Sequence, residues 1–314
     1  MSAALLAHAH RTIAVGSRSF ATASRLFDAH TRRSAVLLYA WCRHCDDVVD
    51  GQHLGGGGAA DPDGRGAERL RMLYAQTRQA YAGETMTEPA FAALQAVALA
   101  HRIPIALPLA HLDGFAMDVD GHRYDTLDDT LRYCYHVAGV VGLMMARIMG
   151  AHDEATLDRA CDLGLAFQLT NIARDIVDDA QVGRCYLPET WLAAHRVPRV
   201  ELAAPQYRQA LAEMAAALVR AAEPYYASAG HGLAALPLRS AWAVATAHGV
   251  YREIGLRVER EGARAWDQRV STSRATKLRL LLRAAGTAVR SRRRVPPARP
   301  AQLLQRPLTS DAGR

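Results

Sequence analysis

Hydrophobic residues recur every three or four positions along most of the chain, and few segments alternate with period two. This spacing is typical of amphipathic helices, because residues three and four apart lie on one helix face. No stretch approaches the ~18 to 20 uninterrupted apolar residues that a membrane-spanning helix requires. We therefore predict an all-α protein of roughly ten or more helices. Such patterns cover residues 8–27, 67–82, 88–101, 103–117, 158–177, 205–228 and 236–262.

Two of the predicted helices carry carboxylates within otherwise apolar sequence. Asp46 and Asp50 end the first, and Asp175 and Asp179 end the second. Each pair is four residues apart, which places both side chains on one helix face, one turn apart. Like charges in this arrangement repel and cost an isolated helix a few tenths of a kcal/mol. A hard cation between the carboxylates would reverse the sign of that interaction.

The repetition of the pattern is more informative than either copy. A single pair of this kind is usually a solvated helix face, but here each pair ends an apolar helix and is accompanied by an arginine, Arg43 or Arg174. Mg²⁺ prefers carboxylate oxygens and commonly shares its coordination shell with substrate phosphates. Two such helices facing each other across a cavity would hold several Mg²⁺ ions, and those ions would hold a diphosphate.

Composition fits one large core and a reducing compartment. Half of the 314 residues are hydrophobic by type, and the five cysteines are irregularly spaced. The N-terminus is too short in apolar length and too poor in charge for a signal peptide, so we expect a cytoplasmic protein. Cys42 and Cys45 have redox-motif spacing, but they lie inside an apolar helix without a second ligand pair. We expect them to be packing residues.

The C-terminal end differs from the rest of the chain. Residues 290–314 are rich in arginine and proline and are predicted to be a disordered tail, which leaves residues 1–289 as one all-α domain. The formal charge is +7, but the tail lacks the interleaved aromatic residues of a nucleic-acid-binding segment. An anionic membrane surface, bound peripherally, is therefore the expected partner, and nucleic acid is not.

Four motifs resemble those of the squalene and phytoene synthases, occur in that family's order and span most of residues 10 to 290. Within the family the chain looks most like the bacterial phytoene synthases of carotenoid pathways. The motifs are Ser17-x-Ser19-Phe20, Leu38-Tyr-Ala-Trp-Cys-Arg-x-x-Asp-Asp-x-x-Asp50, Tyr133-Cys-Tyr-x-Val-Ala-Gly-x-Val-Gly142, and Gln168-x-x-Asn-Ile-x-Arg-Asp-x-x-x-Asp179 followed by Gly183-Arg-x-Tyr-Leu-Pro188.

The resemblance implies a single-domain isoprenoid synthase helical bundle with a central cavity. It implies head-to-head condensation of two geranylgeranyl diphosphates, through prephytoene diphosphate, to phytoene with release of diphosphate. The implied cofactor is Mg²⁺, with Mn²⁺ as an alternative, and no nicotinamide cofactor is expected. The implied metal ligands are Asp46, Asp50, Asn171, Asp175 and Asp179, which with Tyr133 and Tyr251 form the catalytic set. The implied substrate-binding residues are Ser17, Ser19, Phe20, Tyr39, Arg43, Gln168, Asn171, Arg174 and Arg269.

Several alternatives remain open at this stage. A squalene-type or dehydrosqualene-type synthase would use farnesyl diphosphate on the same motifs, although squalene synthesis is disfavoured because the chain shows neither a nicotinamide-binding signature nor a C-terminal membrane anchor. A non-catalytic helical adaptor could bind acidic surfaces through its arginines. Asp118 and Asp120 belong either to the substrate site or to a surface helix end, while the resemblance places Arg184 and Tyr186 near the site mouth. The oligomeric state is not predicted.

Overall fold

Helices make up all of the regular structure in residues 23–51, 64–293 and 295–307, which are the parts of the chain that the computed structural model describes. This confirms the all-α prediction. A π-helical turn, Tyr135–Gly139, joins α7 to α8, and short 3₁₀ turns flank the later helices. The helices are α3 (Ala29–Val49), α4 (Gly66–Ala82), α5 (Pro89–His101), α6 (Ala106–Val119), α7 (Leu127–Cys134), α8 (Val140–Ile148), α9 (Glu154–Gln181), α10 (Glu189–Ala194), α11 (Arg208–Gly232), α12 (Leu238–Glu261) and α13 (Arg274–Ser291).

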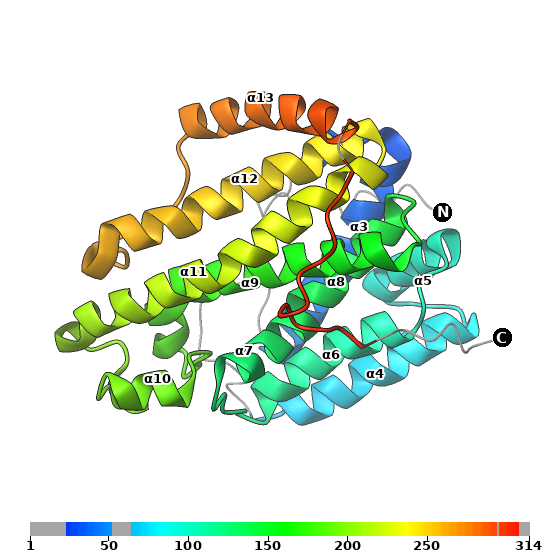
Figure 1. The fold of residues 1–314 in the computed structure, drawn as a ribbon. Coiled ribbons are helices and arrows are strands. Elements are labelled where there is room, and N and C mark those ends of the chain that lie inside the picture. The colour runs from blue at the N-terminus through cyan, green and yellow to red at the C-terminus, as the bar shows by residue number, and fades with distance from the viewer. Residues whose placement is uncertain (1–22, 52–63, 294, 308–314) are drawn as a thin grey trace.

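Helix α9 lies at the centre of the bundle and packs against α8, α11 and α12 (Figure 1). It is the longest described helix, and the apolar positions expected from its sequence are buried around most of its circumference. The buried side chains include Leu165, Leu169, Ile172 and Ile176. A helix buried in this way holds the polar groups at its C-terminal end in a fixed position relative to its neighbours.

Local capping signals set several helix starts as the sequence indicates. Asp28 caps α3, because its carboxylate accepts hydrogen bonds from the backbone N–H groups of His30 and Thr31, both at 2.9 Å. Thr126 and Asp129 form a reciprocal capping box at the start of α7. These caps fix where the helices that carry the first aspartate motif and Tyr133 begin.

Two glycines allow α9 to approach the preceding helix and π-turn closely. A Cβ on Gly164 would overlap the carbonyl oxygen of Ala138, and a Cβ on Gly142 would overlap that of Ala160. The small-residue run in residues 137–142 therefore serves tight helix packing. Both glycines also line the central cavity described below.

The C-terminal segment corrects one prediction. Residues 295–307 were expected to be disordered, but they form an ordered chain that runs from α13 back across the bundle (Figure 1). Leu303 is 3% exposed and Arg306 is 7% exposed. The physical reason lies outside the segment, because carboxylates on α9 pair with its arginines, as with Arg299 and Asp162 at 2.7 Å. Within the described ranges, no helix combines the length and the hydrophobicity required to cross a bilayer.

Candidate active site

A cavity of about 780 Å³ lies beside α9, with walls that include residues of α3, α6, α8, α11, α12 and α13. This volume falls within the usual range for small-molecule sites. One end of the cavity is polar, and most of the remaining wall is apolar. The polar residues at that end include Arg43, Asp46, Asp118, Gln168, Asn171 and Arg184.

The first aspartate motif forms the last two turns of α3. Arg43 bridges two carboxylates there, with Nη1 2.9 Å from Asp46 and Nη2 2.7 Å from Asp47. Burial in the cavity wall raises the pKa of Asp46 to about 6, against the lowering effect of Arg43 and with the help of the neighbouring Asp50. The Asp46 carboxylate is therefore held where a positive charge would stabilise its ionised form.

The second motif forms the C-terminal turns of α9. Arg174 donates to Asp175 with Nε 2.8 Å from Oδ1, and Arg269 donates to the other oxygen with Nη2 3.0 Å from Oδ2. Arg269 comes from the link before α13, so three elements meet at this carboxylate. Burial, followed by the charge of Asp175, raises the pKa of Asp179 to about 7.

Arg184 connects the two motifs. It follows the end of α9, where Gly183 turns the chain with a φ of 81°, and its Nη1 lies 3.2 Å from Asp50 Oδ2. The same arginine lowers the pKa values of Asp46 and Asp179 through its charge. The ends of the two aspartate helices therefore share one electrostatic environment.

The polar end fits a divalent cation, judged by its donor atoms. Asn171 Oδ1 is buried and accepts no hydrogen bond, which leaves a lone pair free to bind a cation. Asp46 and Asp179 have raised pKa values because they lack compensating positive charge. Across the described ranges, no three His, Cys, Asp or Glu side chains converge on one point. That arrangement suits Mg²⁺, which uses one or two carboxylates with water and substrate phosphates.

A second polar group surrounds Asp118 at the C-terminal end of α6. Its two carboxylate oxygens accept hydrogen bonds from Tyr133 at 3.1 Å and from Tyr186 at 3.0 Å. The two tyrosine rings are stacked, with centroids 4.5 Å apart. Burial raises the pKa of Asp118 to about 6 although Arg184 lies nearby. Asp118 is thus a residue of the cavity, whereas Asp120 is exposed.

Aromatic side chains cover the wall between the polar and apolar parts of the cavity. Tyr251 of α12 stacks on Phe167 of α9 with ring centroids 4.2 Å apart, and both rings line the cavity together with Tyr39. Burial raises the pKa of Tyr251 above its ordinary value and that of Tyr39 to about 12. Both hydroxyls therefore stay protonated at neutral pH.

The structure brings most of the predicted residues together. Ser17, Ser19 and Phe20 fall outside the described residues. Arg184 and Tyr186, which the resemblance placed near the site mouth, and Asp118 join the site more closely than their sequence context indicates. Seven predicted residues line the cavity: Tyr39, Arg43, Asp46, Tyr133, Gln168, Asn171 and Tyr251. The others form the ion-paired polar end: Asp50, Arg174, Asp175, Asp179 and Arg269.

Comparisons with known proteins agree with this arrangement. Residues 13–276 match the family model described as squalene/phytoene synthase. The chain is 64% identical to a 15-cis-phytoene synthase from Pantoea ananas over 97% of this chain and 98% of the relative. It is 56% identical to a phytoene synthase from Pseudescherichia vulneris over the same shares of both chains.

Solved structures show the same fold. A dehydrosqualene synthase in complex with a ligand superposes with a TM-score of 0.79 at 28% identity, over 90% of this chain and 96% of that one. The squalene synthase HpnC from Alicyclobacillus acidocaldarius superposes with a TM-score of 0.70 at 24% identity, over 83% of this chain and 97% of that one.

Proposed function

The chain belongs to the squalene/phytoene synthase family of prenyltransferases, and we propose that it joins two geranylgeranyl diphosphates head to head into phytoene. The observation that carries the proposal is the division of one cavity into an ion-paired end, built from both aspartate motifs, and a long apolar remainder. Relatives named phytoene synthase, 56% and 64% identical over nearly the whole chain, support the twenty-carbon substrate over the fifteen-carbon one.

The polar end is suited to binding and releasing diphosphate. Asp46, Asp50, Asn171, Asp175 and Asp179 would hold Mg²⁺ or Mn²⁺. When bound, the metal supplies positive charge that stabilises the departing diphosphate. The guanidinium groups of Arg43, Arg174 and Arg269 now pair with carboxylates of the motifs. Some of their N–H groups would turn to diphosphate oxygens and stabilise the same charge.

The apolar part of the cavity is suited to the carbocation steps. Ionisation of the first C–O bond leaves an allylic cation, and the double bond of the second substrate attacks it to give a cyclopropylmethyl diphosphate. A second ionisation, rearrangement and loss of one proton give phytoene without a reductant. The stacked rings of Phe167 and Tyr251 offer π-faces to positive charge. The apolar wall excludes the water that would trap the cation.

Product analysis tests the reaction. The purified protein is incubated separately with geranylgeranyl and farnesyl diphosphates, with Mg²⁺ or with a chelator, and hydrocarbons are identified by chromatography and mass spectrometry. We expect phytoene from geranylgeranyl diphosphate and its loss with chelator. A thirty-carbon hydrocarbon from farnesyl diphosphate alone would overturn the substrate. No product from either would favour the adaptor.

Conservative substitutions test the two motifs. Asp46→Asn and Asp175→Asn remove one charge each at nearly constant volume, so we expect turnover to fall by about 10² or more while the unfolding transition is retained. Asp178→Asn is the matched control, because Asp178 is exposed on the same helix turn as the second motif. Turnover of either motif variant equal to that of the control would remove its aspartate from the proposed metal site.

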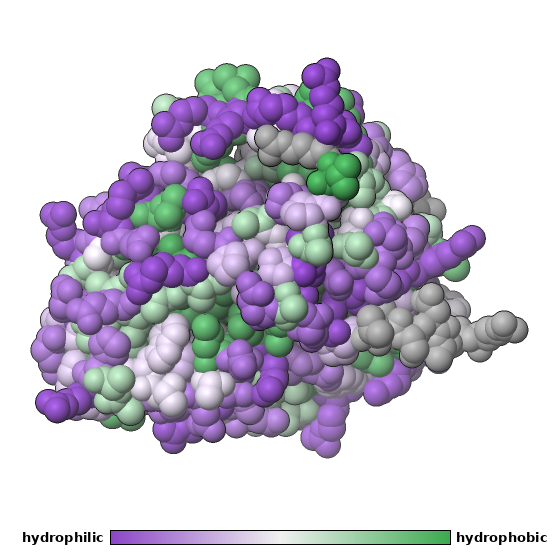
Figure 2. All heavy atoms as spheres, in the orientation of Figure 1, coloured by the Kyte–Doolittle hydropathy of each residue, from purple (hydrophilic) through white to green (hydrophobic). Residues whose placement is uncertain are grey.

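We further propose that the protein binds an anionic lipid surface through α13. This helix has no acidic residue, and its exposed apolar side chains are Leu278, Leu282 and Val289, between 53% and 65% exposed. Hydrophobic groups stand among hydrophilic ones along the upper edge of the molecule, where α13 lies (Figure 2). Each basic residue near an anionic membrane contributes about 1 kcal/mol. The exposed basic residues of α13 are Arg274, Arg279, Arg283 and Arg290.

The position of α13 beside the cavity supports this surface. Leu278 and Leu281 also line the cavity, so a hydrocarbon product would leave close to the bilayer. Vesicle sedimentation tests the proposal, with a Leu278→Ser, Leu282→Ser variant expected to lose at least fivefold in affinity for phosphatidylglycerol vesicles. Leu99→Ser, at an 82% exposed leucine of α5, is the control. Equal binding by both variants, or equal binding to neutral vesicles, would contradict it.

A further inference from the structure

The cavity has a second end, remote from the aspartate motifs. The cavity-lining residues of α9 recur along one face of the helix from the polar end towards its N-terminus. Between Asn171 and Thr156 this face extends about 22 Å, at 1.5 Å rise per residue. The far end is where the hydrocarbon terminus of a prenyl diphosphate would lie. The lining residues along this face are Asn171, Gln168, Gly164, Ala160 and Thr156.

An arginine lies at this far end. Arg159 lines the cavity and is only 7% exposed. Its Nη1 donates to Ser228 Oγ at 2.8 Å and to the Ser228 carbonyl at 3.3 Å, and its Nη2 donates to the Pro297 carbonyl at 2.6 Å. The stem packs on α11 where Gly232 leaves room, since a Cβ there would lie 2.7 Å from Arg159 Cβ.

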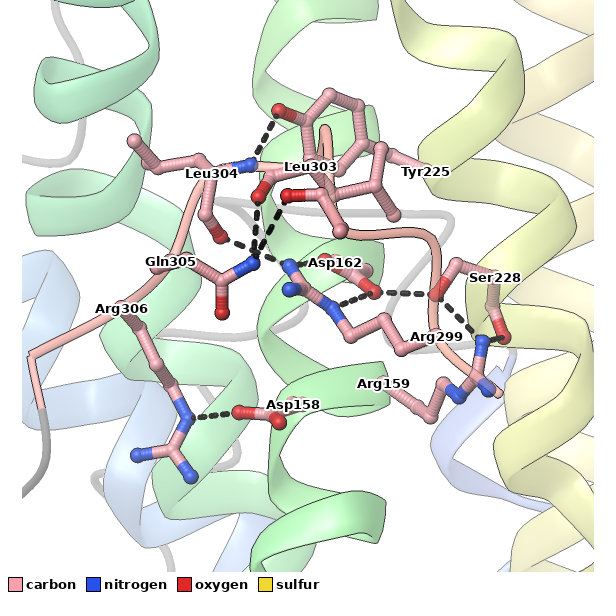
Figure 3. A network of polar contacts seen from close by, with 11 residues as sticks. Asp158, Arg159, Asp162, Tyr225, Ser228, Arg299, Leu303, Leu304, Gln305 and Arg306 are labelled. Atoms are coloured by element: carbon pink, nitrogen blue, oxygen red, sulfur yellow. Dashed lines mark hydrogen bonds and ion pairs between the residues drawn. The ribbon is translucent and has the colours of Figure 1, made fainter.

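The C-terminal segment holds this arginine in position. Residues 295–307, called the strap here, supply the Pro297 carbonyl and also Arg299. Arg299 donates Nε to Asp162 Oδ2 at 3.0 Å and Nη2 to Oδ1 at 2.7 Å. Asp162 is fully buried and also accepts a hydrogen bond from Ser228 (Figure 3). The strap is thus fixed within one helical turn of Arg159.

The strap is fixed at a second point further along. Arg306 pairs with Asp158 at 2.7 Å and also with Glu154 on the first turns of α9. The backbone N–H of Leu304 donates to the hydroxyl of Tyr225 at 3.1 Å (Figure 3). Because Arg159 is buried, moving it would strand its donors and the Pro297 carbonyl without partners, which is costly. The far end of the cavity is therefore a stiff wall.

We propose that Arg159, held by the strap, forms the floor of the hydrocarbon end and limits the chain length of the prenyl diphosphate. This inference rests on the proposed function, because it assigns the far end of the same cavity. An apolar chain that ends at the floor is accepted, and one that is longer by an isoprene unit has to displace Arg159 from its three acceptors. Arg159 is therefore a specificity-determining residue.

Two variants of opposite effect test the floor. Rates are measured with fifteen-, twenty- and twenty-five-carbon prenyl diphosphates. Arg159→Ala removes the floor, so we expect kcat/KM for the twenty-five-carbon substrate to rise at least tenfold relative to the twenty-carbon one. Ala229→Leu adds volume to the cavity wall on α11, near Ser228 and Gly232. It should lower kcat/KM for the twenty-carbon substrate at least tenfold relative to the fifteen-carbon one. Effects of this size are those expected from small changes in hydrophobic pockets.

The control separates selectivity from stability. Arg147→Ala removes another buried arginine, 8% exposed on α8, that is not among the described residues lining the cavity. It should leave the chain-length ratios unchanged even if it lowers stability. A wild-type protein that makes no forty-carbon product would contradict the proposed function. Normal product with unchanged ratios in Arg159→Ala would overturn the floor alone, and if that variant does not fold, unchanged ratios in Ala229→Leu would do so.

Discussion

At the scale of single residues, His111 shows what the cavity wall demands of a titratable group. It is 4% exposed, and its ring lies against Trp41 and Phe115. Its Nδ1 is 3.2 Å from the carbonyl oxygen of His136, so Nδ1 carries the proton, because a carbonyl can only accept. Burial lowers the pKa of His111 to about 4. The folded protein therefore holds this ring neutral.

This shift predicts an acid-sensitive contribution to stability. The pKa of His111 is lower in the folded state than its ordinary value of about 6.5, so the unfolded chain binds the proton first as pH falls. Between pH 7 and pH 5 the wild type should lose about 2 kcal/mol of unfolding free energy through this group. His111→Asn should not show that loss when urea denaturation is compared at both pH values.

The control for this prediction is His152→Asn, at an exposed position. Carboxylates with raised pKa values, such as Asp46 and Asp179, act in the opposite direction on acidification. They are common to both proteins, so their effect cancels in the comparison of wild type with variant. A His111→Asn variant with the same pH dependence as the wild type would show that the folded ring binds its proton normally.

Residue-scale sequence reasoning predicts the candidate site unevenly, for a physical reason. Asp175 and Asp179 can be found because two charges at helical spacing in an apolar helix need compensation. Asp118 carries no such signal, because its hydrogen bonds come from Tyr133 and Tyr186, distant in sequence. Its role depends on which helices meet, and only the structure shows that.

At the scale of helices, the close approach of α9 to the π-turn before α8 depends on Gly164. We expect Gly164→Ala to lower the unfolding free energy by about 1 to 3 kcal/mol, because its Cβ would overlap the carbonyl oxygen of Ala138, and backbone cannot move as a side chain can. Urea denaturation followed by circular dichroism measures the change.

The same substitution at Gly230 on α11 is the control. A Cβ at Gly230 would meet no atom within 4 Å, and alanine is favoured over glycine in a helix interior by about 0.5 to 1 kcal/mol. The two substitutions should therefore change stability in opposite directions. Equal effects would mean that the crossing beside α9 relaxes without cost.

Helix positions are predicted well where local chemistry decides them. Asp28 and Thr126 begin their helices because their side chains satisfy unpaired backbone N–H groups, a purely local effect. The π-turn Tyr135–Gly139 has no local signature of this kind. It lies at the crossing with α9, where Gly139 also packs closely against Cys161 and Leu165. Its presence reflects contacts between helices.

At the scale of the whole molecule, the strap shows how a composition rule can fail. Prolines and arginines leave residues 295–307 without a hydrophobic pattern of their own, so composition predicts disorder. The segment is ordered because α9 presents Glu154, Asp158 and Asp162 to its arginines. Those carboxylates lie more than a hundred residues away in sequence, and no local window contains both partners.

Arg299 carries the most deeply buried of these pairs and gives the sharpest test. Asp162 is fully buried, so Arg299→Gln would leave its charge without a cation, and we expect a loss of about 3 to 5 kcal/mol of unfolding free energy. Asp162→Asn combined with Arg299→Gln removes both charges, so the double variant should recover part of that loss in a double-mutant cycle. Arg132→Gln, which breaks an exposed pair with Asp129 where the arginine is 65% exposed, should cost at most about 1 kcal/mol. If Arg299→Gln were as mild as this control, the strap would be held by its other contacts, and burial of Asp162 would not depend on its arginine.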